Sequence, residues 1–150
     1  MILYLDSSAL VKRHVTEPGS DQVEGIAKTA ELLATAIISR AEVSAALAKA
    51  VRVGGLNKAQ ALTSLESFRK EWQNYLRLDL NESAIARADN LVWDHPLRGY
   101  DSVHLASALI WQEAMDQPVT FATYDQQLWR SAERVGLLVF PTDLVRAKKE

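Results

Sequence analysis

Four acidic residues are placed where their carboxylates could act together. Each stands beside the predicted end of a strand or start of a helix: Asp6, Glu42, Asp101 and Asp125. In open α/β sheets, ligands bind outside the carboxyl ends of the parallel strands, so carboxylates from several strand ends can meet there. Such a cluster repels itself unless a cation neutralises it, and hard divalent ions such as Mg²⁺ prefer oxygen ligands. The four acids therefore predict a metal site.

The segments around these acids differ. Asp6 follows the apolar run 2–5, and Asp125 follows the strand-like run 119–123. Asp101 follows a turn and begins the most apolar predicted helix, so the sequence gives it no preceding strand. Glu42 lies in the first turn of a helix that follows a further strand.

Each acid also has a purely structural interpretation. Asp is a preferred helix N-cap, and Ser39-x-x-Glu42 matches a capping box. Against this, Ser7, Ser8 and Thr123 lie at the same strand ends and could cap without a charge. We therefore treat these three hydroxyl residues as supporting groups that cap, or that orient a metal-bound water.

His104 lies one turn after Asp101 and could join it as a metal ligand. A histidine in so apolar a helix is more often a packed core residue, and the sequence does not decide its role.

Length and composition set broad bounds. The chain has 150 residues, 48% of them apolar, with a net charge of −2, as expected of one globular domain without a global positive field. The absence of cysteine excludes disulfides, a thiolate zinc site and a thiol nucleophile. We expect a cytoplasmic protein, with neither a signal peptide nor a membrane span.

Strand-like and helix-like runs alternate along the chain. The predicted strands are 2–5, 32–36, 76–80, 119–122 and 137–140. The predicted helices run from about 7 to 14, 21 to 30, 39 to 54, 57 to 75, 81 to 93, 101 onward and 126 to 135. This order predicts a single α/β domain over residues 1–150, a three-layer α/β/α sandwich around a mainly parallel sheet of about five strands.

Two helices in succession, over 39–75, predict an inserted or projecting hairpin. The second carries an apolar stripe at helical spacing: Leu62, Leu65, Phe68, Trp72 and Tyr75. We interpret the stripe first as core or hairpin packing and second as a dimer or partner groove. The basic tail 146–149 is expected to be solvated.

Four motifs together resemble the PIN-domain ribonucleases, and among them the VapC-type toxins of toxin–antitoxin pairs. The motifs are Asp-Ser-Ser-Ala-Leu at 6–10, Glu42 after Ser39-Arg40, Tyr-Asp-Ser-Val-His-Leu-Ala at 100–106, and Thr-Tyr-Asp at 123–125.

The resemblance implies that Asp6, Glu42, Asp101 and Asp125 bind Mg²⁺ or Mn²⁺ and cut RNA. It also implies a homodimer, and a cognate antitoxin protein that blocks the site. We assign Asp6 and Asp101 as the principal ligands, and Glu42 and Asp125 as ligands of a second ion or of metal-bound waters; the number of ions stays open.

Two alternatives remain: a PIN-type nuclease of RNA processing outside a toxin pair, and a receiver-like metal-binding signalling domain. A receiver begins with adjacent acids and carries a lysine on its last strand, whereas Asp6 is followed by serines and 137–140 holds no lysine. A phosphatase with an aspartyl nucleophile would need a second Asp where Ser8 stands. A binding module survives only if the acids are caps.

Overall fold

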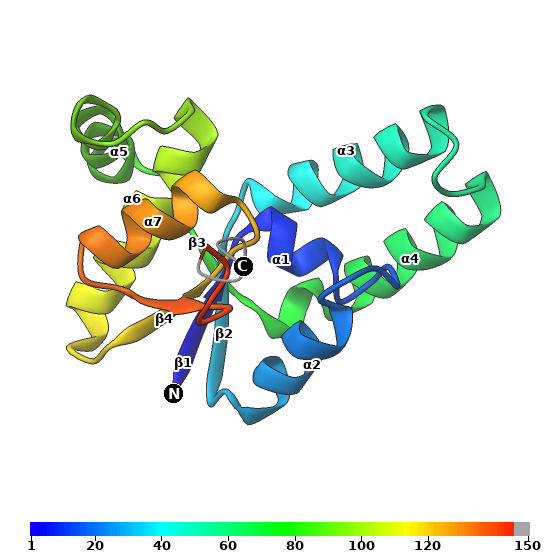
Figure 1. The fold of residues 1–150 in the computed structure, drawn as a ribbon, viewed down its shortest axis with the longest axis horizontal. Coiled ribbons are helices and arrows are strands. Elements are labelled where there is room, and N and C mark those ends of the chain that lie inside the picture. The colour runs from blue at the N-terminus through cyan, green and yellow to red at the C-terminus, as the bar shows by residue number, and fades with distance from the viewer. Residues whose placement is uncertain (146–150) are drawn as a thin grey trace.

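The computed structural model describes residues 1–145 and contains one five-stranded parallel sheet (Figure 1). The strands are β1 (Ile2–Leu5), β2 (Leu32–Ala36), β3 (Leu76–Leu78), β4 (Val119–Ala122) and β5 (Leu138–Phe140). Their order across the sheet is β3-β2-β1-β4-β5, and every neighbouring pair is parallel. The basic tail at 146–149 lies outside the described residues.

Seven α-helices are present within residues 1–145. They are α1 (Ser7–Val11), α2 (Ser20–Thr29), α3 (Ser39–Arg52), α4 (Lys58–Glu71), α5 (Glu82–Asp94), α6 (Gly99–Met115) and α7 (Gln126–Arg134). A short 3₁₀ turn, η1 (Trp72–Asn74), follows α4. In this part of the chain, no helix is both long enough and apolar enough to span a bilayer.

The sheet lies between two helical layers. Helices α1 and α2 cover one face and α5, α6 and α7 the other, which confirms the three-layer sandwich (Figure 1). Strand β1 shows why the fold takes this form, because all four of its residues are buried. Ile2 and Tyr4 pack into the core beneath α6 and α7, while Leu3 and Leu5 pack into the core beneath α1 and α2. A strand covered on both faces needs an uninterrupted apolar run.

Helices α3 and α4 extend beyond the sheet as an antiparallel pair, the projecting hairpin that the sequence predicts (Figure 1). The apolar stripe, which runs from α4 through η1 to Tyr75, is mainly core, in agreement with its first interpretation. Phe68, Trp72 and Tyr75 are buried against α1, α2 and α3, while Leu62 is 53% exposed. Phe68 and Trp72 therefore do not supply a dimer surface.

Several predicted boundaries were wrong by a few residues. Helix α1 ends at Val11 rather than near 14, and α4 gives way to the 3₁₀ turn before 75. Strand β3 ends at Leu78 instead of 80, and β5 begins at Leu138. Helix ends fray and tighten according to tertiary packing, which the local pattern does not record.

The strand order reverses beside β1. The chain leaves β1 for β2 and β3 on one side, then returns to β4 and β5 on the other. In open α/β sheets this reversal creates a crevice at the carboxyl ends of the two central strands. Here these are β1 and β4, held in register through Leu5 and Ala122, and the backbone N–H of Asp6 donates to the Ala122 carbonyl at 3.1 Å.

Candidate active site

A pocket of about 280 Å³ opens at this reversal, and the four acids line it together. Its lining is Asp6, Ser7, Ser8, Glu42, Arg98, Tyr100, Asp101 and Asp125. Thr123, the third predicted hydroxyl residue, reaches the pocket through its contact with Asp6. The fold thus gathers residues from 6 to 125 into one place.

Asp6 is the buried member of the set. Its Oδ1 accepts from the Ala9 backbone N–H at 2.9 Å and from the Ser8 hydroxyl at 2.7 Å. Its Oδ2 accepts from the Thr123 hydroxyl at 2.6 Å. Burial raises the pKa of Asp6, although these donors and the nearby His104 act in the opposite direction. The residue caps α1 and also presents a costly buried charge to the pocket.

Ser8 and Thr123 have matching roles. Each hydroxyl donates to Asp6 and accepts a backbone N–H from the segment after β4. Ser8 accepts from Tyr124 at 2.9 Å, and Thr123 accepts from Asp125 at 3.1 Å. The two hydroxyls thereby join the carboxyl ends of the two central strands.

Asp125 caps α7, because its Oδ1 accepts from the Leu128 backbone N–H at 2.9 Å. Its Oδ2 lies 3.6 Å from Nη2 of Arg98. The capping interpretation is therefore correct for both Asp6 and Asp125. In both residues the capping bond engages Oδ1, but Oδ2 of Asp6 accepts from Thr123 whereas Oδ2 of Asp125 lies near Arg98.

Asp101 does not begin its helix as predicted. Helix α6 starts at Gly99 and Arg98 occupies the N-cap in an extended conformation, so Asp101 stands in the first turn. A negative charge there still favours the positive end of the helix dipole. Oδ2 of Asp101 accepts from Nε of Arg98 at 3.1 Å. Asp101 therefore faces the pocket without serving as a cap.

The capping box predicted for Ser39 and Glu42 is wrong. Ile38 occupies the N-cap of α3, and the Ser39 hydroxyl is instead bonded to the hydroxyl of Thr35 in β2 at 2.6 Å. Glu42 turns toward α6, where its Oε1 accepts from Nε2 of His104 at 2.6 Å. Contacts with β2 and α6 therefore take the place of the local capping box.

Both ring nitrogens of His104 are engaged, because Nδ1 lies 2.6 Å from the hydroxyl of Tyr4. The ring is buried. The structure supports the packed interpretation of His104 rather than the metal-ligand one.

Arg98 lines the pocket but was not among the predicted site residues. Its guanidinium contacts both Asp101 and Asp125, although 82% of the side chain is exposed. The available signal was its position three residues before Asp101, where a helix brings two side chains together. Tyr100, 64% exposed at the same rim, gave no comparable signal.

The donor set suits a hard divalent cation, because the pocket offers carboxylate and hydroxyl oxygens. Within residues 1–145, however, no three carboxylate, imidazole or thiol side chains converge closely enough to form a metal site as they stand. The guanidinium of Arg98 supplies positive charge to two of the acids. The oxygen donors of the pocket are of the kind that Mg²⁺ prefers, and Mg²⁺ often takes only one or two carboxylates and fills its other positions with water.

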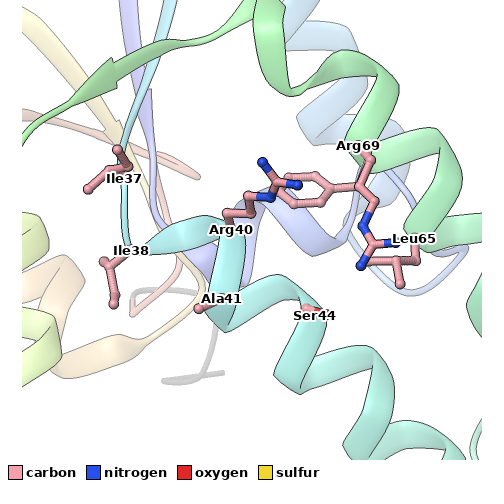
Figure 2. Close-up of a pocket in the computed structure, with 8 residues that line it drawn as sticks. Ile37, Ile38, Arg40, Ala41, Ser44, Leu65 and Arg69 are labelled. Atoms are coloured by element: carbon pink, nitrogen blue, oxygen red, sulfur yellow. The ribbon is translucent and has the colours of Figure 1, made fainter.

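A groove of about 450 Å³ lies between α3 and α4, beside the acid pocket. Its lining is Ile37, Ile38, Arg40, Ala41, Ser44, Leu65, Phe68 and Arg69. Figure 2 shows Arg40 projecting from α3 and Arg69 from α4 into the space between the two helices. Arg40 and Ala41 directly precede Glu42, so one turn of α3 borders both the groove and the acid pocket.

Replacing Asp6 separates its capping role from the cost of its charge. Asp6→Asn keeps a cap acceptor, so in EDTA at pH 7 its free energy of unfolding should equal or exceed that of wild type. Asp6→Ala should lose about 1–3 kcal/mol, because buried donors lose their acceptor. The folded-state pKa of Asp6 is raised, so the native state binds the extra proton, and wild-type stability falls as pH rises from about 4 through the raised pKa.

The advantage of Asp6→Asn should therefore grow across that pH interval in urea unfolding curves. An Asn variant as unstable as the Ala variant at pH 7 would contradict this account of the buried charge.

Known proteins match this chain over most of its length. The family model of the PIN domain matches residues 3–133. Ribonuclease VapC45 of Mycobacterium tuberculosis is 31% identical over 143 residues, which covers 95% of this chain and 97% of the relative.

Two solved structures share the fold. PAE2754 from Pyrobaculum aerophilum has a TM-score of 0.64 at 21% identity, over 100% of this chain and 91% of that one. VapBC2 from Rickettsia felis, solved bound to a DNA fragment from their promoter, has a TM-score of 0.60 at 18% identity, over 93% of this chain and 97% of that one. With the family model matched from the first strand to α7, this chain belongs to the PIN domain family.

Proposed function

We propose that this protein is a Mg²⁺-dependent endoribonuclease and the toxin of a toxin–antitoxin pair. The observation that carries the proposal is the convergence of four acids, from four separate segments, on one pocket at the reversal of strand order. The relationship to a ribonuclease VapC supports RNA as the substrate.

Asp6 and Asp101 are the principal metal ligands in this proposal, and Glu42 and Asp125 hold a second ion or metal-bound waters. A bound Mg²⁺ lowers the pKa of water and neutralises phosphate oxygens. Ser8 and Thr123 fix the carboxylate of Asp6, and the cap at Asp125 leaves its Oδ2 facing the pocket. Arg98, once displaced from the acids, offers an exposed guanidinium to the RNA phosphate.

RNA cleavage tests this assignment directly. Purified protein should cut single-stranded or looped RNA with Mg²⁺ or Mn²⁺ and stop with EDTA. Asp6→Asn, Glu42→Gln, Asp101→Asn and Asp125→Asn should each remove cleavage, because each deletes a carboxylate from the pocket. Asp79→Asn, an exposed acid outside the pocket, is the matched control and should cut like wild type. Unchanged cleavage in EDTA would refute the metal-dependent reaction.

A PIN-type nuclease of RNA processing outside a toxin pair is the alternative within the family. Growth arrest on expression, absent for Asp6→Asn, favours the toxin. Active nuclease without arrest favours RNA processing. The receiver-like alternative is disfavoured by the match to the PIN family model.

The groove between α3 and α4 is the proposed docking surface for the antitoxin. An antitoxin that covers the acid pocket would also contact the surface next to the pocket. The groove is part of that surface, because it shares a turn of α3 with Glu42. Apolar side chains line the groove, and Arg40 and Arg69 add positive charge. This chemistry fits an apolar segment that also carries acidic residues.

Ile37→Asp should weaken capture of the antitoxin, because it places a charge on an exposed, apolar groove residue. The test is co-purification with the cognate antitoxin, followed by RNA cleavage by the variant alone, which should persist. Leu62→Asp, an exposed leucine on α4 outside the groove, is the control. Equal loss of binding in both variants would place the interface elsewhere.

Homodimerisation is also proposed, with α5 as its surface. Trp93, at 84%, has the largest exposed fraction among the large apolar side chains of residues 1–145, and Ile85 is exposed on the same helix. Sedimentation at micromolar concentration without antitoxin should show a dimer for wild type. Trp93→Ser should shift the population toward monomer; a wild type that stays monomeric contradicts the proposal.

A further inference from the structure

We propose that His104 is a positioning residue that holds the Glu42 carboxylate toward the acid pocket, and that Tyr4 anchors His104 from the central strand. The inference rests on the proposed function, in which Glu42 is a metal ligand. It gives a role to Tyr4 and His104, two buried polar residues that the proposed reaction does not otherwise use.

The chain of contacts joins three elements far apart in sequence. The Tyr4 hydroxyl in β1 lies 2.6 Å from Nδ1 of His104 in α6, and Nε2 of His104 lies 2.6 Å from Oε1 of Glu42 in α3. Tyr4 and His104 are both almost fully buried, whereas Glu42 is half-buried at the pocket. The contacts therefore run from the core to the pocket wall.

The direction of the hydrogen bonds follows from the groups. An ionised Glu42 only accepts, so Nε2 of His104 carries the proton. At Nδ1, a neutral ring accepts from the Tyr4 hydroxyl, whereas an imidazolium donates to the Tyr4 oxygen. Burial, together with the charge of Asp6, raises the pKa of Tyr4 well above its usual value, which keeps the phenol protonated. In either form of the ring, each of the three side chains has a hydrogen-bond partner.

Glu42 has particular need of such support. Asp6 and Asp125 are oriented by backbone N–H groups, and both sit directly at a helix start. Within residues 1–145, the side-chain hydrogen bond of Glu42 is the one from His104. Glutamate loses more rotamer freedom than aspartate when it is fixed, so a rigid donor reduces what a metal must order.

Tyr4 is itself held firmly. Its ring stacks on Phe121 of β4, with centroids 5.1 Å apart and planes 6° from parallel. The series of contacts from Tyr4 to Glu42 therefore begins on the same pair of strands that leads into Asp6 and Thr123. The central strands position one acid directly and a second acid through His104.

The test measures Mn²⁺ binding by calorimetry, separately from cleavage. His104→Leu removes the donor to Glu42 and should weaken Mn²⁺ affinity by about 10–100-fold, the usual effect of losing a hydrogen-bond partner of a metal ligand. His104→Gln retains an N–H donor and should stay closer to wild type. Tyr4→Phe should weaken affinity less than His104→Leu, because His104 keeps its contact with Glu42.

Tyr75→Phe is the matched control for Tyr4→Phe. Tyr75 is also a buried tyrosine with a bonded hydroxyl, but its partners Arg13 and Glu71 lie outside the acid pocket. Thermal unfolding in EDTA reports stability for every variant. A purely structural role for His104 predicts lower melting temperatures with wild-type Mn²⁺ affinity, whereas Tyr75→Phe should show that behaviour in either case.

Glu42→Gln separates the two levels of the argument. Wild-type protein that fails to bind Mn²⁺ overturns the proposed function and this inference together. Binding that weakens in Glu42→Gln but not in His104→Leu overturns only the inference, as does a His104→Gln variant as weak as His104→Leu. If His104→Leu does not fold, Tyr4→Phe is compared with the control Tyr75→Phe. A lower Mn²⁺ affinity in Tyr4→Phe supports the inference, and equal affinities overturn it.

Discussion

The buried carboxylate of Asp6 is the constraint on which the site depends. A charge removed from water is tolerated only when hydrogen bonds replace its hydration. The Ala9 N–H and the hydroxyls of Ser8 and Thr123 provide these bonds. Because both hydroxyls also accept N–H groups from the segment after β4, satisfying one carboxylate fixes the two central strand ends against each other.

The remaining acids are accommodated in different ways. Asp101 and Asp125 both contact the guanidinium of Arg98, while Glu42 accepts a hydrogen bond from Nε2 of His104. The sequence analysis treated the acids as a set of like charges awaiting a cation. In the structure each acid already has a partner, so the raised pKa of Asp6 arises first from burial rather than from its acidic neighbours.

Features that depend on local sequence pattern could be predicted, whereas contacts between residues far apart in the sequence could not. The uninterrupted apolar run of β1 correctly predicts a strand covered on both faces, and alternating elements correctly predict the layered sheet. The convergence of Asp6 and Asp125 follows from the rule for strand ends, whereas Asp101 follows no strand and Glu42 lies inside α3. The contact of Glu42 with His104 spans 62 positions and leaves no local trace in the sequence. The capping box, the purely structural interpretation of Glu42, is absent from the structure. The groove between α3 and α4 likewise depends on how two helices lie against each other.

The first turn of α3 has two neighbours at once. Arg40 and Ala41 face the groove, and Glu42 faces the acid pocket. A substitution in this turn therefore alters two surfaces through one stretch of backbone. Evolution cannot adjust the groove here independently of the pocket, so drift in this segment should be slow and compensated in pairs, while the outer end of the same hairpin is free to diversify.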